Sequence, residues 1–158
     1  MKQLKNIILC ALCLLLTGCQ SKTKVDPTLS NAWTCTQSTT VIRIENNNDT
    51  LQKTQQVFIL PYDAIQTDSS SSPDQAKQEA LALCEQMFQD LNGVTFQGEA
   101  QETGIQCTLT IDYAKADLSQ LKDASLTEQL GLKEGYISLS DTIDKLESDG
   151  FACQAVNP

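Results

Sequence analysis

Cysteine is the residue type that offers this chain the most chemistry, because the sequence contains seven cysteines and no histidine. The absence of histidine excludes His-based catalytic triads, His-ligated zinc and histidine general bases. A thiol can accept a lipid, pair into a disulfide, bind a metal or act as a nucleophile. Cys10, Cys13 and Cys19 lie close to the amino terminus. The remaining four are spread along the chain: Cys35, Cys84, Cys107 and Cys153.

Cys19 ends the stretch Leu16-Thr17-Gly18-Cys19, which resembles the lipobox of bacterial lipoproteins. Lys2 and Lys5 precede ten apolar residues, 7–16, as in a secretory signal. Ten apolar residues are too few for a transmembrane helix, which needs about 20. We therefore expect residues 1–18 to be a lipoprotein signal peptide and Cys19 to carry the lipid. Each buried methylene contributes about 0.8 kcal/mol, so two or more acyl chains, palmitate among them, give stable anchoring.

Two alternatives to this interpretation are an ordinary secretory signal with an accidental cysteine and an uncleaved membrane stub. Cys10 and Cys13 have the Cys-x-x-Cys spacing of redox and metal motifs, but they lie inside the signal and leave with it. The predicted location is the cell membrane or the outer membrane, on the extracytoplasmic side. The sequence does not distinguish a Gram-positive from a Gram-negative envelope.

The four remaining cysteines predict two disulfides, because thiols in an exported domain usually pair. Cys84 lies on the apolar stripe of a predicted helix and Cys107 on the apolar face of a predicted strand, and those faces should meet. We therefore expect Cys84–Cys107 and Cys35–Cys153, the second joining the two ends of the domain. The other two pairings, buried free thiols and a catalytic thiol are the alternatives.

The charge balance also limits the partners. The chain has 11 basic and 20 acidic residues. Loss of Lys2 and Lys5 with the signal leaves 9 basic residues, a net charge of about −11 that disfavours nucleic acid and anionic membrane surfaces. Arg43 is the single arginine, which excludes an arginine cluster for phosphate. The lipid must therefore hold the protein to the membrane, with residues 19–30 as a flexible polar tether.

Motifs for catalysis or metal binding are absent from the sequence. It has no Gly-x-Ser-x-Gly and no glycine-rich phosphate loop, and its serines and lysines are scattered through polar stretches. Two groups of aspartates lack the EF-hand spacing, and we interpret them as solvated surface. These are Asp112, Asp117 and Asp123, and then Asp141, Asp144 and Asp149. We expect no enzyme activity, no cofactor and no metal.

Strand and helix patterns follow the tether. Two amphipathic helices are predicted at 73–92 and 140–149, the second with Ser140 as its cap. Leu118 and Leu121 suggest a short helical turn. Strands are expected at 32–44, 50–60, 94–97, 105–113 and, as a last short element, 151–153. The predicted fold is α+β, an antiparallel sheet with both amphipathic helices packed on one face, and residues 31–158 form one domain.

This order of elements resembles the YehR-like family of small bacterial lipoproteins, a domain of unknown function. The resemblance rests on Asn92-Gly93-Val94, Thr110-Ile111-Asp112-Tyr113 and Gly150-Phe151. It covers about residues 31–158 and implies an α+β fold. It carries over no active site, and the four mature cysteines depart from the family pattern.

The function expected from these features is that of a lipid-anchored envelope protein acting by binding. Its partner would be another envelope protein or a small ligand. A structural or stress-related envelope lipoprotein is the alternative, and a carboxylate-based enzyme is a weaker one. Trp33, the single tryptophan, and Tyr62 are a candidate contact surface if both are exposed on one side. If they are buried, they are ordinary core residues.

Overall fold

The structure is a computed structural model that describes residues 31–65 and 73–156. The predicted signal peptide, Cys19 and the tether lie outside these residues. The strands are β1 (Ala32–Gln37), β2 (Thr40–Asn47), β3 (Thr50–Pro61), β4 (Val94–Ala100), β5 (Gly104–Asp112), β6 (Gly131–Leu132), β7 (Ile137–Ser138) and β8 (Ala152–Ala155). The helices are α2 (Pro73–Phe88), α3 (Leu118–Asp123) and α4 (Leu139–Ser148), with a 3-10 turn at Tyr62–Ala64.

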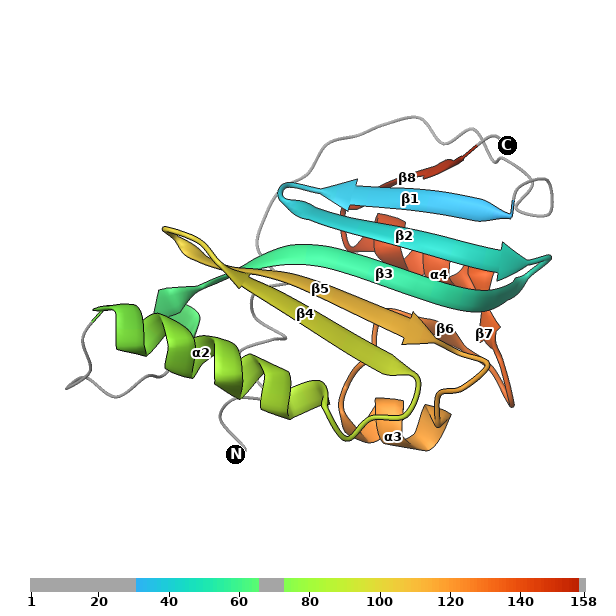
Figure 1. The fold of residues 1–158 in the computed structure, drawn as a ribbon. Coiled ribbons are helices and arrows are strands. Elements are labelled where there is room, and N and C mark those ends of the chain that lie inside the picture. Colours follow the sequence, from blue (N-terminus) through green and yellow to red (C-terminus); the bar gives the residue numbers. More distant parts are fainter. Residues whose placement is uncertain (1–30, 66–72, 157–158) are drawn as a thin grey trace.

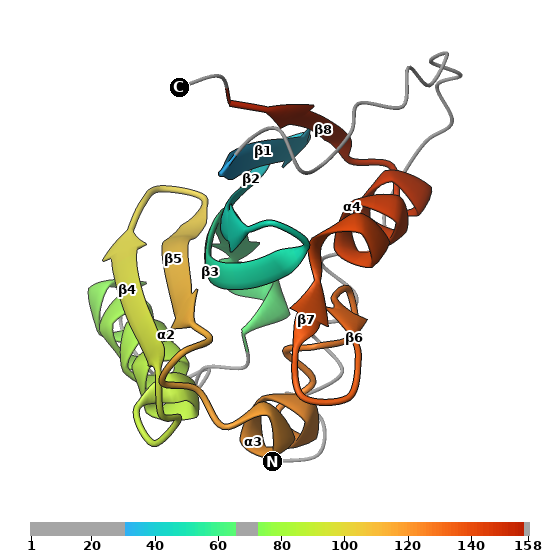
Figure 2. The same cartoon turned by 90° about the vertical axis from the view of Figure 1, so that its right-hand side faces the viewer.

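A twisted antiparallel sheet dominates the molecule (Figure 1). Its strands run in the order β4-β5-β3-β2-β1-β8, and β7 joins the start of β3 through Thr50 and Ser138. In Figure 2 α2 lies beside the β4–β5 end, while α4 lies beyond β7 toward the β1–β8 end. The predicted α+β class with a mostly antiparallel sheet is confirmed.

Left-handed backbone at two turns lets β1, β2 and β3 follow one another directly. Ser38, with a φ of 51°, turns β1 into β2, and Asn48, with a φ of 52°, turns β2 into β3. Asparagine tolerates this conformation better than most residues, because its short polar side chain bonds locally. The segment 32–44, which the sequence predicts as one or two strands, thus belongs to two strands. The turn expected at residues 45–49 consists of Asn48 and Asp49 alone.

Alternating side chains give the sheet one apolar side. Residues opposite each other in neighbouring strands point to the same side. One such row runs through Trp33, Ile44, Thr54, Ile111 and Val94. Buried sheet residues and helix residues together form two hydrophobic clusters, one toward each end of the sheet.

The first cluster lies between α4 and strands β1–β3. It comprises Trp33, Cys35, Ile42, Ile44, Leu51, Ile137, Leu139, Ile143, Leu146 and Phe151. The second lies between α2 and strands β3–β5, and comprises Leu60, Ile65, Ala80, Cys84, Ile105 and Cys107. We call them the α4 cluster and the α2 cluster.

The helices differ from prediction at their ends. Helix α2 ends at Phe88, four residues before the predicted end, and Leu91 closes a turn back to the Phe88 carbonyl. The cap of α4 is Ser138, whose hydroxyl accepts the Asp141 N–H at 3.3 Å, so the predicted cap Ser140 is wrong. The hydroxyl of Ser140 instead lies 3.1 Å from that of Ser138. The turn suggested by Leu118 and Leu121 is helix α3, capped by Asp117.

Candidate functional site

The aspartates singled out in the sequence serve local structure. Asp112 pairs with Lys115 at 2.7 Å, and the Lys115 ammonium lowers the pKa of the Asp112 carboxyl. Asp117 accepts the N–H and hydroxyl of Ser119, which lowers the pKa of Asp117. The described residues 31–65 and 73–156 contain no group of three or more cysteines, aspartates or glutamates placed to hold a metal ion.

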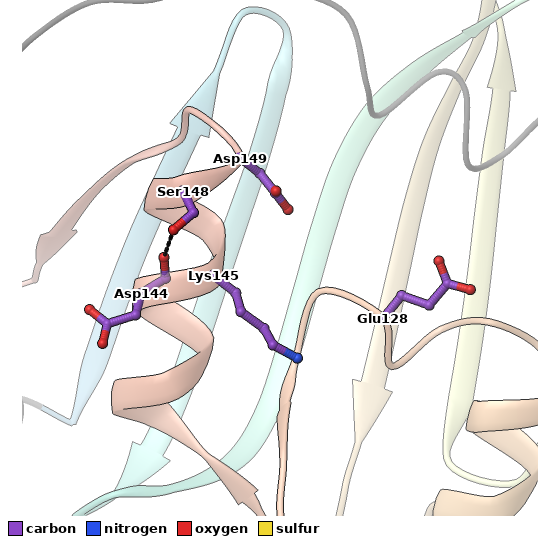
Figure 3. Close-up of a pocket in the computed structure, with 5 residues that line it drawn as sticks. All are labelled: Glu128, Asp144, Lys145, Ser148 and Asp149. Atoms are coloured by element: carbon purple, nitrogen blue, oxygen red, sulfur yellow. Dashed lines mark hydrogen bonds between the residues drawn. The ribbon is translucent and has the colours of Figure 1, made fainter.

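A shallow hollow of about 380 Å³ lies beside α4. It is lined by Glu128, Asp144, Lys145, Ser148 and Asp149, whose side chains point in different directions (Figure 3). The Lys145 ammonium donates to the Leu130 carbonyl at 2.7 Å, and Gln129 donates to the Asp149 carboxylate at 3.3 Å. With its cation already engaged and its carboxylates apart, the hollow has no acid–base pair around one point.

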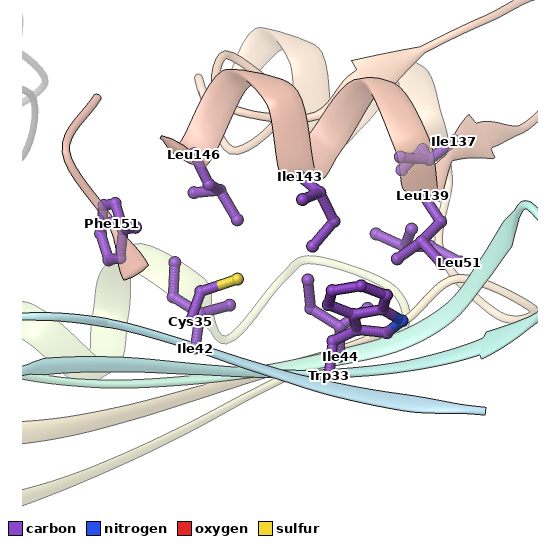
Figure 4. Close-up of a cluster of buried hydrophobic side chains, with 10 residues drawn as sticks. All are labelled: Trp33, Cys35, Ile42, Ile44, Leu51, Ile137, Leu139, Ile143, Leu146 and Phe151. Atoms are coloured by element: carbon purple, nitrogen blue, oxygen red, sulfur yellow. The ribbon is translucent and has the colours of Figure 1, made fainter. Parts of the chain in front are cut away.

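Trp33 and Tyr62 do not form the suggested contact surface. Trp33 is buried in the α4 cluster, with its ring between the sheet and the helix (Figure 4). Tyr62 is half-buried against the α2 cluster, and its hydroxyl donates to the Gln101 carbonyl at 2.8 Å. Both are core residues of different clusters, because Trp33 alternates inward with Cys35 and Tyr62 follows the inward Leu60.

Cys35 and Cys153 are joined by a disulfide between β1 and β8. They are direct partners in the antiparallel pairing, and Cys35 is fully buried beside Phe151 in the α4 cluster. The bond links positions 118 residues apart. It therefore ties the first described strand to the last one.

Cys84 and Cys107 are buried free thiols, so the structure does not contain the expected bond between them. The helix stripe and the strand face nevertheless meet, because both thiols are buried in the α2 cluster. The Cys107 thiol donates to the Ile105 carbonyl at 3.5 Å. Interaction with the Cys107 thiol lowers the pKa of Cys84, and interaction with Cys84 together with burial raises the pKa of Cys107. The two thiols thus lie in one cluster at a helix–sheet interface without a covalent link.

Asp49 is an anchoring residue that sequence reasoning missed. Its carboxylate accepts the Ser138 hydroxyl and the Ser140 N–H, each at 2.8 Å, and its carbonyl accepts the Leu139 N–H at 2.8 Å. Burial alone would raise the pKa of Asp49, but these hydrogen bonds outweigh it and the pKa is lowered. The β2–β3 turn thus holds the start of α4. The contact spans about 90 residues and has no local sequence signal.

None of the helices in the described part of the chain is long and apolar enough to cross a membrane. No curated protein matches this sequence. The family described as protein of unknown function DUF1307 matches residues 31–152. The chain belongs to this family.

Two solved structures share the fold of this DUF1307 member. The YehR protein of Escherichia coli, determined by NMR, is 16% identical with a TM-score of 0.56, covering 84% of this chain and 95% of that one. An NMR structure of a protein from Streptococcus pneumoniae TIGR4 is 15% identical with a TM-score of 0.52, covering 89% of this chain and 94% of that one. The predicted likeness to the YehR-like family is confirmed, and at these identities the likeness concerns the fold alone.

Proposed function

We propose that this protein is a lipid-anchored component of the bacterial cell envelope whose domain acts by binding a partner. The stretch Leu16-Thr17-Gly18-Cys19 supports the anchor. The Cys35–Cys153 disulfide supports an extracytoplasmic location, since disulfides persist in oxidising compartments and are rare in the cytosol. The lipid anchor and the disulfide are independent features, and both support the extracytoplasmic side of the membrane.

The observation that carries the binding role is the side of the sheet opposite the two clusters. We infer that α2 and α4 cover the same side. The row of Ile44 in the α4 cluster reaches Ile111 on β5, and Ile111 alternates onto the same side of β5 as Cys107 in the α2 cluster. The other side is then left open. One row across it contains Thr34, Arg43, Gln55, Thr110 and Thr95.

The open side consists mainly of short or neutral hydrogen-bonding side chains. The neighbouring row contains Thr36, Val41, Val57, Thr108 and Gln97. Arg43 is exposed and donates to the neutral Gln55 side chain at 2.9 Å, so no carboxylate neutralises it in that contact. Small ligands usually need a concave, largely apolar pocket, whereas an open polar sheet can contact the surface of another protein. We therefore favour an envelope protein as the partner.

Photo-crosslinking in intact cells tests this role. A photoreactive residue replaces Thr36, which is exposed on the open side, and in a matched strain it replaces Asp144, which is exposed on α4. We expect one defined crosslinked envelope protein from position 36 and none from position 144. Equal labelling from both positions, or none from either, contradicts binding through the open side.

The anchor is tested separately by the intact mass of the membrane-extracted protein and by a Cys19→Ala variant. We expect the mass of residues 19–158 plus acyl chains, and release of the variant from the membrane fraction. An unlipidated mass for the native protein contradicts the anchor and leaves the crosslinking result to stand by itself.

A further inference from the structure

The Cys84–Cys107 thiol pair lies where α2 meets the sheet. Cys84 is 4% exposed and lies one helical turn after Ala80 and one before Phe88, all three facing inward. Cys107 is 1% exposed in the middle of β5, with Ile105 beside it on the same side. Both thiols belong to the α2 cluster, so the helix and the strand direct the two side chains into the same interior space.

A glycine beside this pair lets the helix approach closely. Gly98 is the direct partner of Cys107 in the β4–β5 pairing. A Cβ at Gly98 would lie 2.4 Å from a Leu81 methyl carbon and 3.1 Å from the Phe96 ring. Leu81 precedes Cys84 by one turn of α2. Because Gly98 has no side chain, α2 can lie close to Cys107.

The α2 end of the domain has no covalent link to the sheet apart from the chain itself. The disulfide of the domain joins β1 to β8, at the opposite end. Helix α2 is held by the apolar contacts of its own cluster and by the stacked rings of Phe88 and Phe96, 5.1 Å apart. Elements held by few buried contacts open locally at a lower free energy than the whole domain.

We propose that Cys84 and Cys107 are a redox-convertible pair that closes into a disulfide by exchange with a disulfide-bearing oxidant, and so locks α2 onto β5. The substrate class is a small-molecule or protein disulfide. This inference does not depend on the lipid anchor or on the binding partner.

The exchange has two steps. The Cys84 thiolate attacks one sulfur of the oxidant, the oxidant's S–S bond breaks, and its other sulfur leaves as a thiolate that takes up a proton. The Cys107 thiolate then attacks Cys84 in this mixed disulfide and releases the second oxidant thiol. Overall, two protein thiols are oxidised to one disulfide, while one oxidant disulfide is reduced to two thiols, with two protons transferred.

Cys84 acts first because of its place and its environment. It lies on the element that moves, so lifting α2 exposes Cys84 to solvent. Interaction with the Cys107 thiol lowers the pKa of Cys84 and so favours its thiolate, which is the reactive form. Cys107 stays within the central part of the sheet and becomes the resolving thiol when α2 returns.

Thiol counting on the purified full-length protein tests this proposal. The protein is incubated with oxidised glutathione, quenched with iodoacetamide under denaturing conditions and measured by intact mass and peptide mapping. We expect alkylation at Cys84 and at Cys107 to disappear, no glutathione to remain on either residue, and one cross-linked peptide pair containing Cys84 and Cys107. Hydrogen exchange of the α2 amides should slow at least several-fold after oxidation, with α4 unchanged.

Two matched variants separate the steps. Cys107→Ala should trap one glutathione on Cys84, whereas Cys84→Ala should leave Cys107 largely unmodified in the same time. Circular dichroism checks that both variants fold. The proposal is overturned if both wild-type thiols remain alkylatable, if each keeps its own glutathione, or if Cys84 or Cys107 pairs instead with Cys35 or Cys153.

Discussion

At the β1–β8 end of the sheet, α4 and the last strand are closed over the core by a disulfide and by the Asp49 anchor. At the β4–β5 end, α2 lies over a smaller apolar cluster that contains a thiol pair and no disulfide. The two ends thus use the same sheet and the same helix-on-sheet packing but differ in how the helix is retained. One end of the domain is therefore fixed by a covalent bond, whereas the other end is held by noncovalent contacts that can break and reform.

The largest expected effect comes from removing the fixed link. Cys35→Ala/Cys153→Ala should lower the free energy of unfolding by about 4 kcal/mol, because the bond closes a loop of 118 residues. Urea unfolding of the wild type and the double variant measures the difference. The matched control, Cys84→Ala/Cys107→Ala, removes two unlinked thiols and should cost only about 1–2 kcal/mol. An equal loss of unfolding free energy in both double variants would mean that the disulfide does not make the β1–β8 end more firmly held than the β4–β5 end.

Packing in the α4 cluster gives the next largest effect. Leu146→Ala should destabilise the whole domain by roughly 3 kcal/mol, since Leu146 is 1% exposed and its truncation leaves a cavity. The midpoint of thermal or urea unfolding measures it. Leu132→Ala is the control, because Leu132 is 38% exposed and should change stability by no more than about 0.5 kcal/mol. Similar losses at both positions would contradict the assignment of Leu146 to the core.

How far the sequence predicts this molecule depends on the length of each element. Helix α2 and strands β3 and β5 are long enough for a clear 3.6- or 2-residue period, so their existence and type were predicted correctly. Strands β6 and β7 contain two residues each, which is too short for any period, so no sequence pattern predicted them.

The site predictions likewise succeeded only where a sequence pattern carried the information. The meeting of Cys84 with Cys107 followed from two facing apolar stripes, whereas the state of the thiols depends on oxidation, which the sequence does not encode. Trp33 was a contact-surface candidate if exposed and a core residue if buried, and its alternation with Thr34 and inward Cys35 favours the burial that the structure shows. The Asp49 anchor depends on tertiary contacts to Ser138 and Ser140, for which no spacing rule exists.

A substitution at Gly98 tests whether α2 opens independently of α4, without changing any cysteine. Gly98→Val places methyl groups against Leu81 and Phe96 and should push α2 outward, at a cost of about 1–2 kcal/mol. Native-state hydrogen exchange should show faster exchange in α2 than in the wild type, with α4 amides unchanged. Thr95→Val, on the exposed side of the same strand, is the control. Uniformly faster exchange in both helices would mean that the two ends open together.

The smallest effect concerns the anchor of α4 and depends on pH. The folded-state pKa of Asp49 is lowered, so its stabilisation is present above the unfolded pKa of about 3.9 and is lost as the pH falls through the folded value. Asp49→Asn should cost about 1 kcal/mol at pH 7, comparable to loss of a helix cap. Urea unfolding at pH 7 and near pH 2 measures both states, and the gap between wild type and variant should narrow at the lower pH. Asp144→Asn, at an exposed position of α4, is the control for removing a carboxylate from the same helix region. A constant gap for Asp49→Asn would mean that the carboxylate charge does not hold α4, and that the hydrogen-bond geometry alone does.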